Sequence, residues 1–519
     1  MPPEQEKESA FKLPVLSGRW VWAANPQSGR VAAIDTRSLS VGLVQAGFAP
    51  TFLAPLPREG AVLSAAVVLN ARSQDATLMR LSNTGIEALT VGTHAGANAW
   101  TMSPSGRWAI AWTDANAITR PDRAESFQDI TLIDTQAPVP RATRLSVGYR
   151  PSRIFVQADE SRAFVIAEPG ISIIELDAET PSVSRDIGLL APGSAASLDV
   201  TVIPSGTHAL ARNEGSPDVR IIDLQTGEQT RVTLSGPVTD LDLVADGSTA
   251  IAVVRGQLLG ADPAQSEGGG SGEGGGSGEG GASGEGGASG EGGQSGATPA
   301  SRYGPSQVAV LSIPDVLRDP EHFASALIND VVGSVAVAAD GSRVVLYTTA
   351  LPVDRLTVLS TKPSASDYFV PRSVTVRAPA QAVFVAPDAE HAIVSLQLAP
   401  ASKLGGAFAV VPLTKALPVK IQTTDAPITS VAFAPAPTTS ALLTAASGRT
   451  AYLVHMPSLL VTPVGLSNLP LAAGIVPEEN VGYVVQQHPE GLLSLVNLDT
   501  GEPRTLTGFE LSAQVGNAN

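Results

Sequence analysis

Short apolar segments alternate with tight turns along almost the whole chain. In a recurring unit, two apolar segments flank a turn that contains Pro-Ser-Gly or Asp-Gly, as in residues 200–210 and 241–251. Asp-Gly between apolar segments favours a β-hairpin, because glycine adopts a positive φ without steric cost. A third apolar segment, often with an acidic end as in residues 130–134, and a more polar fourth segment complete most units. The pattern therefore predicts four strands in each unit.

The units recur at the spacing of propeller blades. They are separated by about 41 to 52 residues, apart from one interval that contains an insertion, and a four-stranded repeat of this length is typical of a β-propeller. The units at residues 378–416 and 428–459 lack the acidic end of the third strand. The first strands are expected to begin near residues 48, 100, 150, 197, 238, 331, 378, 428 and 469.

The two ends of the chain complement each other in this pattern. Residues 20–25 and 31–35 resemble second and third strands with no first strand before them, whereas residues 508–515 resemble a first strand. We expect the C-terminal strand to complete the blade that the N-terminal strands begin, which would hide two open sheet edges. The predicted fold class is all-β, a β-propeller of about ten four-stranded blades closed by pairing of the N- and C-terminal strands. Two smaller rings are the alternative.

A long Gly/Ser/Glu-rich stretch, residues 265–300, fills the widest interval between units. Because it has no apolar surface to bury, we expect a disordered loop. Strand-like segments at residues 250–254 and 307–313 favour a loop inserted within one blade, with a linker between two domains as the alternative. The predicted organisation is a flexible tether at residues 1–16 and a single β-propeller over residues 17–519 that contains this loop.

The amino-acid composition excludes several classes of partner and of chemical site. The formal net charge is −16 at pH 7, and Lys and Arg are not clustered, which argues against nucleic acid and anionic membranes. The chain has no cysteine, so disulfides, thiolate metal sites and a cysteine nucleophile are excluded. No segment has the roughly 18 consecutive apolar residues of a membrane span. Aromatic residues are only 4% of the chain, so the core is expected to consist mainly of Val, Ala, Leu and Ile.

The six histidines do not form a pattern typical of a metal or acid–base site. They are expected at unrelated positions: His208 and His391 at the start of second strands, His455 at the end of a third strand, His94 and His488 in loops, and His322 in a short helical stretch. No His-x-His or His-Glu-x-x-His spacing occurs. Asp246 and Asp340 each precede a glycine in a turn and lack the alternating oxygen ligands of a calcium loop. We therefore predict no catalytic residues, no metal site and no cofactor.

Charged residues near the first strands could approach one mouth of the channel. These residues are Arg153, Asp199, Asp240 and Asp242. A hydrolytic site would need histidine, arginine and carboxylate side chains to converge there. Since no histidine shares these positions, solvated rim residues are the favoured interpretation.

The five tryptophans are concentrated in two units. Trp20 and Trp22 belong to one unit, and Trp100, Trp108 and Trp112 belong to another. Trp108 and Trp112 share one face of a strand, because their spacing is even. Packing between neighbouring blades is the favoured interpretation. The alternative is a protein-binding hot spot, so Trp100, Trp108 and Trp112 are the candidate partner-binding residues.

Two segments resemble the YVTN-type β-propeller repeat: Trp20-Val-Trp-Ala-Ala-Asn-Pro-Gln-Ser-Gly-Arg-Val-Ala-Ala-Ile-Asp-Thr36, and Val147-Gly-Tyr-Arg-Pro151 with the hairpin after it. The resemblance covers residues 17–515 apart from the insertion. Members include bacterial and archaeal surface proteins, lactonase-like propellers and envelope lipoproteins. The resemblance implies a location in a bacterial cell envelope, with the polar N-terminal residues following a lipid anchor at a processed N-terminus. Because propeller loops display variable surface and this ring shows no catalytic pattern, we expect a non-enzymatic scaffold that binds a protein partner there. The alternatives are a lactonase-like hydrolase acting at the channel mouth and a cytoplasmic location.

Overall fold

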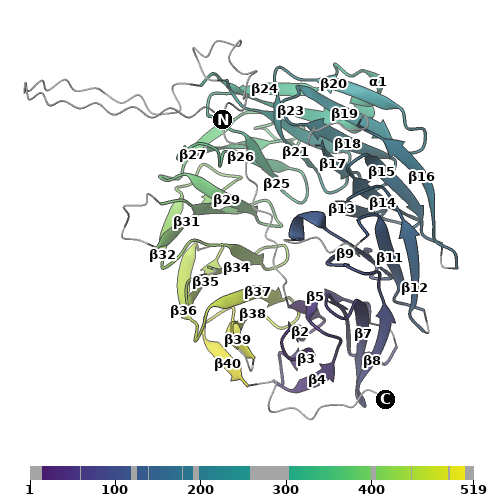
Figure 1. Ribbon diagram of the computed structural model, residues 1–519. Helices are drawn as coiled ribbons and strands as arrows, with labels where there is room; N and C mark the ends of the chain where they lie inside the picture. The colour runs from purple at the N-terminus through teal and green to yellow at the C-terminus, as the bar shows by residue number, and fades with distance from the viewer. Residues whose placement is uncertain are drawn as a thin grey trace, which may run out of the picture.

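The fold is a closed ring of β-sheets around a central opening (Figure 1). The computed structural model describes residues 14–58, 60–118, 126–137, 139–177, 179–190, 198–257, 303–398, 402, 405–445, 447–456, 458–488 and 491–508. Their strands form ten antiparallel sheets of four strands each, which are the blades. The prediction of an all-β propeller of about ten blades is therefore confirmed.

Within each blade the four strands follow chain order from the centre of the ring to its rim (Figure 1). The first five blades are β1–β4 (Val15–Ser17, Trp20–Asn25, Arg30–Asp35, Val41–Gln45), β5–β8 (Pro50–Pro55, Ser64–Asn70, Asp75–Ser82, Gly85–Gly92), β9–β12 (Ala99–Met102, Trp108–Trp112, Asp129–Asp134, Arg141–Ser146), β13–β16 (Arg153–Val156, Arg162–Ala167, Gly170–Glu175, Ser182–Gly188) and β17–β20 (Leu198–Val202, His208–Asn213, Asp218–Asp223, Gln229–Thr233).

The second half of the ring repeats this order. Its blades are β21–β24 (Val238–Leu243, Thr249–Val254, Ser306–Ser312, Ala324–Ile328), β25–β28 (Ser334–Val337, Arg343–Tyr347, Arg355–Ser360, Arg372–Thr375), β29–β32 (Ala380–Val385, His391–Leu396, Gly406–Pro412, Lys420–Thr424), β33–β36 (Ser430–Phe433, Ser440–Thr444, Thr450–His455, Leu460–Gly465) and β37–β40 (Pro470–Val476, Val481–Gln486, Leu492–Asn497, Pro503–Thr507). Two short helices, η1 (Ala115–Ala117) and α1 (Ile313–Arg318), lie in connections.

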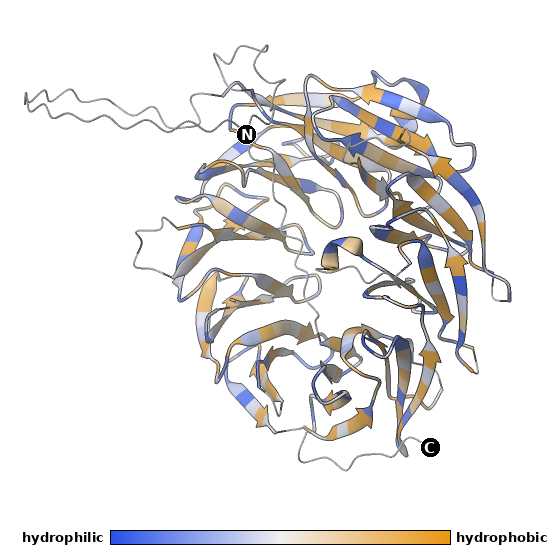
Figure 2. Cartoon of the chain, viewed as in Figure 1, coloured by the Kyte–Doolittle hydropathy of each residue, from blue (hydrophilic) through white to orange (hydrophobic). Residues whose placement is uncertain are grey.

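The core of the ring lies between adjacent blades. Second and third strands are buried on both faces, because each face packs against a neighbouring blade, and Figure 2 shows hydrophobic residues concentrated on the strands. One such cluster joins Phe164 and Ile173 of the fourth blade to Val200 and Ala211 of the fifth. Small and β-branched side chains suit this stacking of twisted sheets, since they let neighbouring sheets approach closely.

An acidic residue at the end of a third strand holds the turn that follows the strand. Asp35 ends β3 and accepts two hydrogen bonds from the Arg19 guanidinium, at 2.9 and 2.8 Å, and a third from the Arg37 amide. Burial opposes the charge on Asp35, but the hydrogen bonds from Arg19 and Arg37 lower its pKa overall. Arg107 and Asp134 form the equivalent pair, at 3.3 Å, in the third blade. The acidic residue thus fixes both the turn and the adjacent strand.

The prediction that the C-terminal strand completes the first blade is wrong. The inner strand of that blade is β1, whose Val15 and Ser17 pair with Trp22 and Trp20 of β2. Residues 14–16, which the sequence assigns to a tether, thus already belong to the ring. Of the predicted closing strand at 508–515, residues 509–515 lie outside the described part of the chain, and Gly508 donates a backbone hydrogen bond to Gly491. A three-residue strand is too short to produce a recognisable apolar alternation.

The ring closes through side chains that join the first blade to the tenth. Val21 and Ile34 pack against Tyr483 and Leu495 in one buried cluster. The phenolic hydroxyl of Tyr483 donates a hydrogen bond of 3.4 Å to the backbone oxygen of Pro14. Closure therefore uses the same blade-to-blade packing as the rest of the ring.

The strands on either side of the Gly/Ser/Glu-rich stretch are neighbours in one sheet. Strand β22 pairs with β23 from Thr249↔Ser312 to Val254↔Gln307. Beyond the strands, the Gly304 amide donates to Gln257 O at 2.8 Å. The sixth blade is thus continuous across the stretch.

Deletion of residues 266–296, with the ends joined by a short Gly-containing turn, is expected to leave the melting temperature nearly unchanged. The paired strands on either side hold the blade together, and shortening the connection to a little under half its length changes the free energy of loop closure by only about 1 kcal/mol. Calorimetry of both proteins measures the effect. Two separately melting halves after proteolysis in this stretch would instead indicate a linker between domains.

Turns between first and second strands interlock around one face of the ring, which we call the hairpin face. In the fifth blade, the Gly206 amide donates to Ile203 O at 2.8 Å, closing a turn with Pro204 and Ser205 at its centre. The Ala158 amide of the fourth blade donates to Pro204 O at 3.0 Å. The turns of these two blades therefore rest on each other.

Candidate functional site

The opposite face of the ring carries the connections between consecutive blades, and we call it the connection face. Because strands alternate in direction, each first strand begins there and each second strand ends there, as the pairing of Arg153 with Ile166 shows. The connection from β10 to β11 contains η1, which lies over the central opening in Figure 1. Long connections on a rigid ring are common binding surfaces in proteins.

A polar side chain at the third position of the third strand anchors the connection into that blade. Thr131 and Ser172 accept the backbone N–H groups of His94 and Gly148 at 2.9 and 3.0 Å. The Tyr452 hydroxyl accepts the Asp425 amide at 3.1 Å. Two further links of the same kind join Thr357 to Asp330 at 2.9 Å and Arg220 to Leu189 O at 3.0 Å. Aligning the third strands of the repeats would reveal this position, which the sequence reasoning missed.

The charged residues considered for the channel mouth form links within and between blades. Asp240 is buried and accepts the Val335 amide of the next blade at 2.7 Å. Asp199 pairs with Arg212 of its own blade at 3.1 Å. The Arg153 guanidinium lies 5.9 Å from the centre of the Phe155 ring. The structure thus gives Asp240 and Asp199 partners within the ring.

Five of the histidines lie where the repeat predicts them, whereas His322, expected in a short helical stretch, lies beyond α1, which ends at Arg318. His208 and His391 begin β18 and β30, and His455 ends β35. His94, expected in a loop, is only 2% exposed. Its Nδ1 lies 2.8 Å from Thr131 Oγ1 and its Nε2 lies 3.3 Å from Thr113 Oγ1, and burial lowers its pKa to about 4.

The Asp-Gly turns use their carboxylates locally. Asp246 accepts the Ser248 amide and hydroxyl at 2.8 and 2.7 Å, and Asp340 does the same with Ser342 at 3.0 and 2.7 Å. Within the part of the chain that the structure describes, no three His, Asp or Glu side chains form a group that could hold a metal ion. No helix among the described residues is long and apolar enough to cross a membrane.

The candidate partner-binding tryptophans differ in exposure. Trp108 and Trp112 are 2% and 7% exposed and pack with Ile154 of the fourth blade. Trp100 is half-buried on β9, against Leu69 of the second blade. Packing between blades thus accounts for the positions of Trp108 and Trp112, and Trp100 retains more surface for a partner.

Two aromatic side chains project from equivalent connections on this face. Phe48 and Tyr149 each follow a glycine and precede a residue with a φ of 53°, and they are 73% and 47% exposed. Phe48 lies before the second blade and Tyr149 before the fourth. The chain segment Gly-aromatic-x-Pro is visible in the sequence at both places, but its exposure follows only from the fold.

A pocket of about 340 Å³ lies beside Tyr149, between the third and fourth blades. Its lining includes Val147, Gly148, Ser172, Asp186 and Gly188. The volume is at the small end of the range for ligand sites, about 300–1,000 Å³. The pocket thus has room for one side chain or a small molecule.

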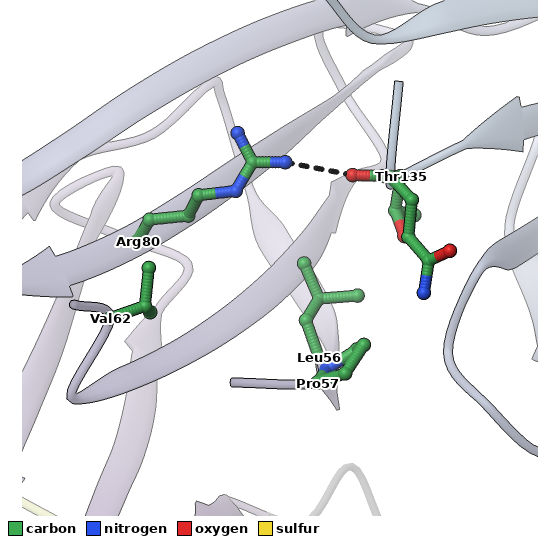
Figure 3. Close-up of a pocket in the computed structure, with 6 residues that line it drawn as sticks. Leu56, Pro57, Val62, Arg80 and Thr135 are labelled. Carbon is green, nitrogen blue, oxygen red and sulfur yellow. Dashed lines mark hydrogen bonds between the residues drawn. The ribbon is translucent and has the colours of Figure 1, made fainter. Parts of the chain in front are cut away.

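A second cleft on the hairpin face is much smaller. It measures about 30 Å³ and lies between the second and third blades. Arg80 crosses it and donates a hydrogen bond of 2.8 Å to Thr135 O (Figure 3). A space of this size holds about one water molecule, so the pocket beside Tyr149 is the stronger candidate site.

Comparisons with known proteins find no match in sequence, and several solved structures resemble the chain at low identity. No family model matches the chain, and no curated protein sequence matches it. Among solved structures, a eukaryotic initiation factor covers 92% of this chain and 95% of its own, at 11% identity and a TM-score of 0.47. The dihydro-heme d1 dehydrogenase NirN covers 87% and 75%, at 11% identity and a TM-score of 0.45.

A third similar structure is a β-propeller domain, that of Cps50 (Swd1) from Myceliophteria thermophila. It covers 79% of this chain and 97% of its own, at 9% identity and a TM-score of 0.37. The class of this protein is defined by its own ten sheets: it is a ten-bladed β-propeller.

Proposed function

We propose that this propeller is a non-enzymatic scaffold that binds a protein partner through the connection face of blades two to four. The observation that carries the proposal is the pair of exposed aromatic side chains at equivalent positions, Phe48 at 73% and Tyr149 at 47%. Exposed aromatic rings on a rigid backbone are typical of binding hot spots, because they bury much surface and lose little conformational entropy. Trp100 lies in the blade between them and adds half-exposed aromatic surface.

Hydrogen bonds hold both aromatic residues in place. The Phe48 amide donates to Ser73 Oγ at 2.9 Å, and the Arg72 amide donates to Phe48 O at 3.2 Å. The Glu168 amide donates to Tyr149 O at 3.0 Å. A surface organised before binding loses less entropy on association, which favours affinity.

A cell-envelope location, with a lipid anchor at a processed N-terminus, belongs to the same proposal. It rests on the resemblance to YVTN-type repeats and on the polar residues at the start of the sequence. Fractionation of the source cell tests it: the protein should be recovered with the envelope and not with the cytoplasmic fraction.

Photo-crosslinking tests the binding surface. With p-benzoylphenylalanine in place of Phe48 or Tyr149, the same partner should be crosslinked from both positions and not from Leu327, which is 66% exposed on an outer strand. For the purified partner, Phe48→Ala and Tyr149→Ala should each weaken binding about tenfold or more, as hot-spot truncation does. Leu327→Ala should leave the affinity unchanged.

Two results would overturn the proposal. One is an affinity that neither aromatic substitution changes. The other is turnover of a lactone that Arg153→Ala abolishes, because this would show a hydrolase acting at the channel mouth.

A further inference from the structure

We infer that the pocket between blades three and four receives the guanidinium or ammonium group of an arginine or lysine side chain from a protein partner. This inference rests on the proposed function and states which chemical group of the partner binds beside Tyr149. It follows from the pocket's charge, its aromatic wall and its size.

An oriented carboxylate supplies the charge. Ser172 is buried at the pocket floor, accepts the Gly148 amide at 3.0 Å and donates its hydroxyl to Asp186 Oδ1 at 2.5 Å. Among the described residues, Asp186 Oδ2 accepts no hydrogen bond, and its carboxylate takes part in no ion pair. One carboxylate oxygen is thus fixed and the other is available to a cation, and charge-assisted bonds of this kind are the strong ones.

The surrounding charges leave the pocket negative. Arg150 forms an ion pair with Glu168 at 2.9 Å, so these two charges offset each other. Arg185, next to Asp186 in sequence, donates to Gln225 O and Thr226 O of the fifth blade. The negative charge of Asp186 is therefore not neutralised by either arginine.

An aromatic wall continues from the pocket to the exposed surface. The Tyr149 ring lines the pocket and meets Phe127 edge to face, with centroids 6.2 Å apart. Its electron-rich face already attracts the Arg150 guanidinium, 5.9 Å from the ring centre. A carboxylate beside an aromatic ring suits a planar or compact cation with an apolar stem. Because the ring also belongs to the proposed interface, the stem of a partner side chain can reach the pocket from there.

Two variants test the charge of the pocket and its empty volume separately. Asp186→Asn removes the charge and preserves the shape. Gly188→Leu keeps the charge and fills the pocket, since a side-chain carbon at Gly188 would meet nothing within 4 Å. Glu179→Gln is the matched control, because it removes one negative charge from an exposed position of the same blade on the opposite face.

The probes are Nα-acetyl-arginine methylamide and its neutral analogue Nα-acetyl-citrulline methylamide, titrated into the full chain by ligand-observed NMR. The arginine probe should bind in the millimolar range and at least fivefold more tightly than the citrulline probe. Asp186→Asn should weaken arginine binding at least fivefold, Gly188→Leu should abolish it, and Glu179→Gln should leave it unchanged.

Failure of this inference and failure of the proposed function give different results. Equal binding of the two probes, or unchanged binding in Asp186→Asn, overturns the cation pocket even if Tyr149→Ala weakens the partner. Binding of the arginine probe with no crosslinked partner overturns the proposed function and supports the pocket chemistry alone.

Discussion

Gly247→Ala is expected to lower the free energy of unfolding by about 3 kcal/mol. Gly247 has a φ of 72° in the hairpin turn of the sixth blade, a conformation that costs an L-residue about 1–2 kcal/mol. An added Cβ would also lie 2.5 Å from Pro204 Cδ and 3.0 Å from Ile203 Cβ of the fifth blade. A proline ring cannot rotate away, so two blades would have to move apart, and overpacking of this kind costs about 1–3 kcal/mol.

Gly227→Ala is the matched control. Gly227 has a φ of 82°, and an added Cβ there would meet nothing within 4 Å. Only the cost of the positive φ remains, so the expected loss in the free energy of unfolding is about 1 kcal/mol. Denaturant unfolding of both variants measures the difference, and equal losses would show that the contact between turns does not stabilise the ring.

Interlocked turns matter because, among the described strands, no sheet combines strands from the two ends of the chain. The same contact recurs in the third blade, where a Cβ at Gly106 would lie 2.8 Å from Pro57 Cδ of the second. Each blade is held to the next by side-chain packing, by turns on the hairpin face and by hydroxyl links on the connection face. Stability in such a repeat array is approximately a sum over neighbouring interfaces, so a weakened turn affects the whole ring.

The blade pattern could be predicted from sequence because each repeat contains the same local signals. All nine predicted first strands begin within about three residues of the observed ones, since an apolar segment before a turn marks each start, and four of these turns contain Pro-Ser-Gly or Asp-Gly. The eighth and ninth blades are regular although β31 ends at Pro412 and β35 at His455. The acidic end therefore strengthens the turn without defining the blade.

The candidate site could not be predicted, because its properties depend on neighbouring blades. Tyr149 was visible in the repeat, yet its exposure and the pocket beside it arise where the third and fourth blades meet. Asp186 lies in a polar fourth strand that resembles the others, and only the hydroxyl of Ser172 distinguishes it. Conversely, Trp108 and Trp112 are prominent in the sequence, but both are buried between blades.

The environment of His94 likewise depends on the fold around it, and this residue is expected to make the ring sensitive to acid. Its backbone N–H donates to Thr131 Oγ1, and its ring nitrogens Nδ1 and Nε2 lie within hydrogen-bond distance of the hydroxyls of Thr131 and Thr113. Protonation would place a positive charge in this buried site, where water cannot solvate it. Burial accordingly lowers the pKa of His94 from 6.5 to about 4.

The free energy of unfolding is therefore expected to fall as the pH drops from 7 to 4.5. In this range the unfolded chain binds a proton at His94 and the folded chain does not, so acid favours unfolding, by about 2–3 kcal/mol for a shift of this size. The loss should begin near pH 6.5 and level off near pH 4. Burial also lowers the pKa of His391, which adds to the loss in the same direction.

Denaturant unfolding at pH 7 and pH 4.5 measures this loss, and the variant His94→Gln assigns it. Glutamine can still hydrogen-bond to Thr131 and Thr113 but does not titrate, so the difference between the two pH values should shrink by about 2 kcal/mol. His208→Gln is the control, because His208 lies at the partly exposed start of β18, and it should retain the pH dependence of the unmodified protein. An undiminished pH dependence in His94→Gln would show that other groups cause the acid sensitivity. The pKa values of carboxylates such as Asp35 are lowered from 3.8, so the acid sensitivity that they add lies at lower pH than that of the histidines.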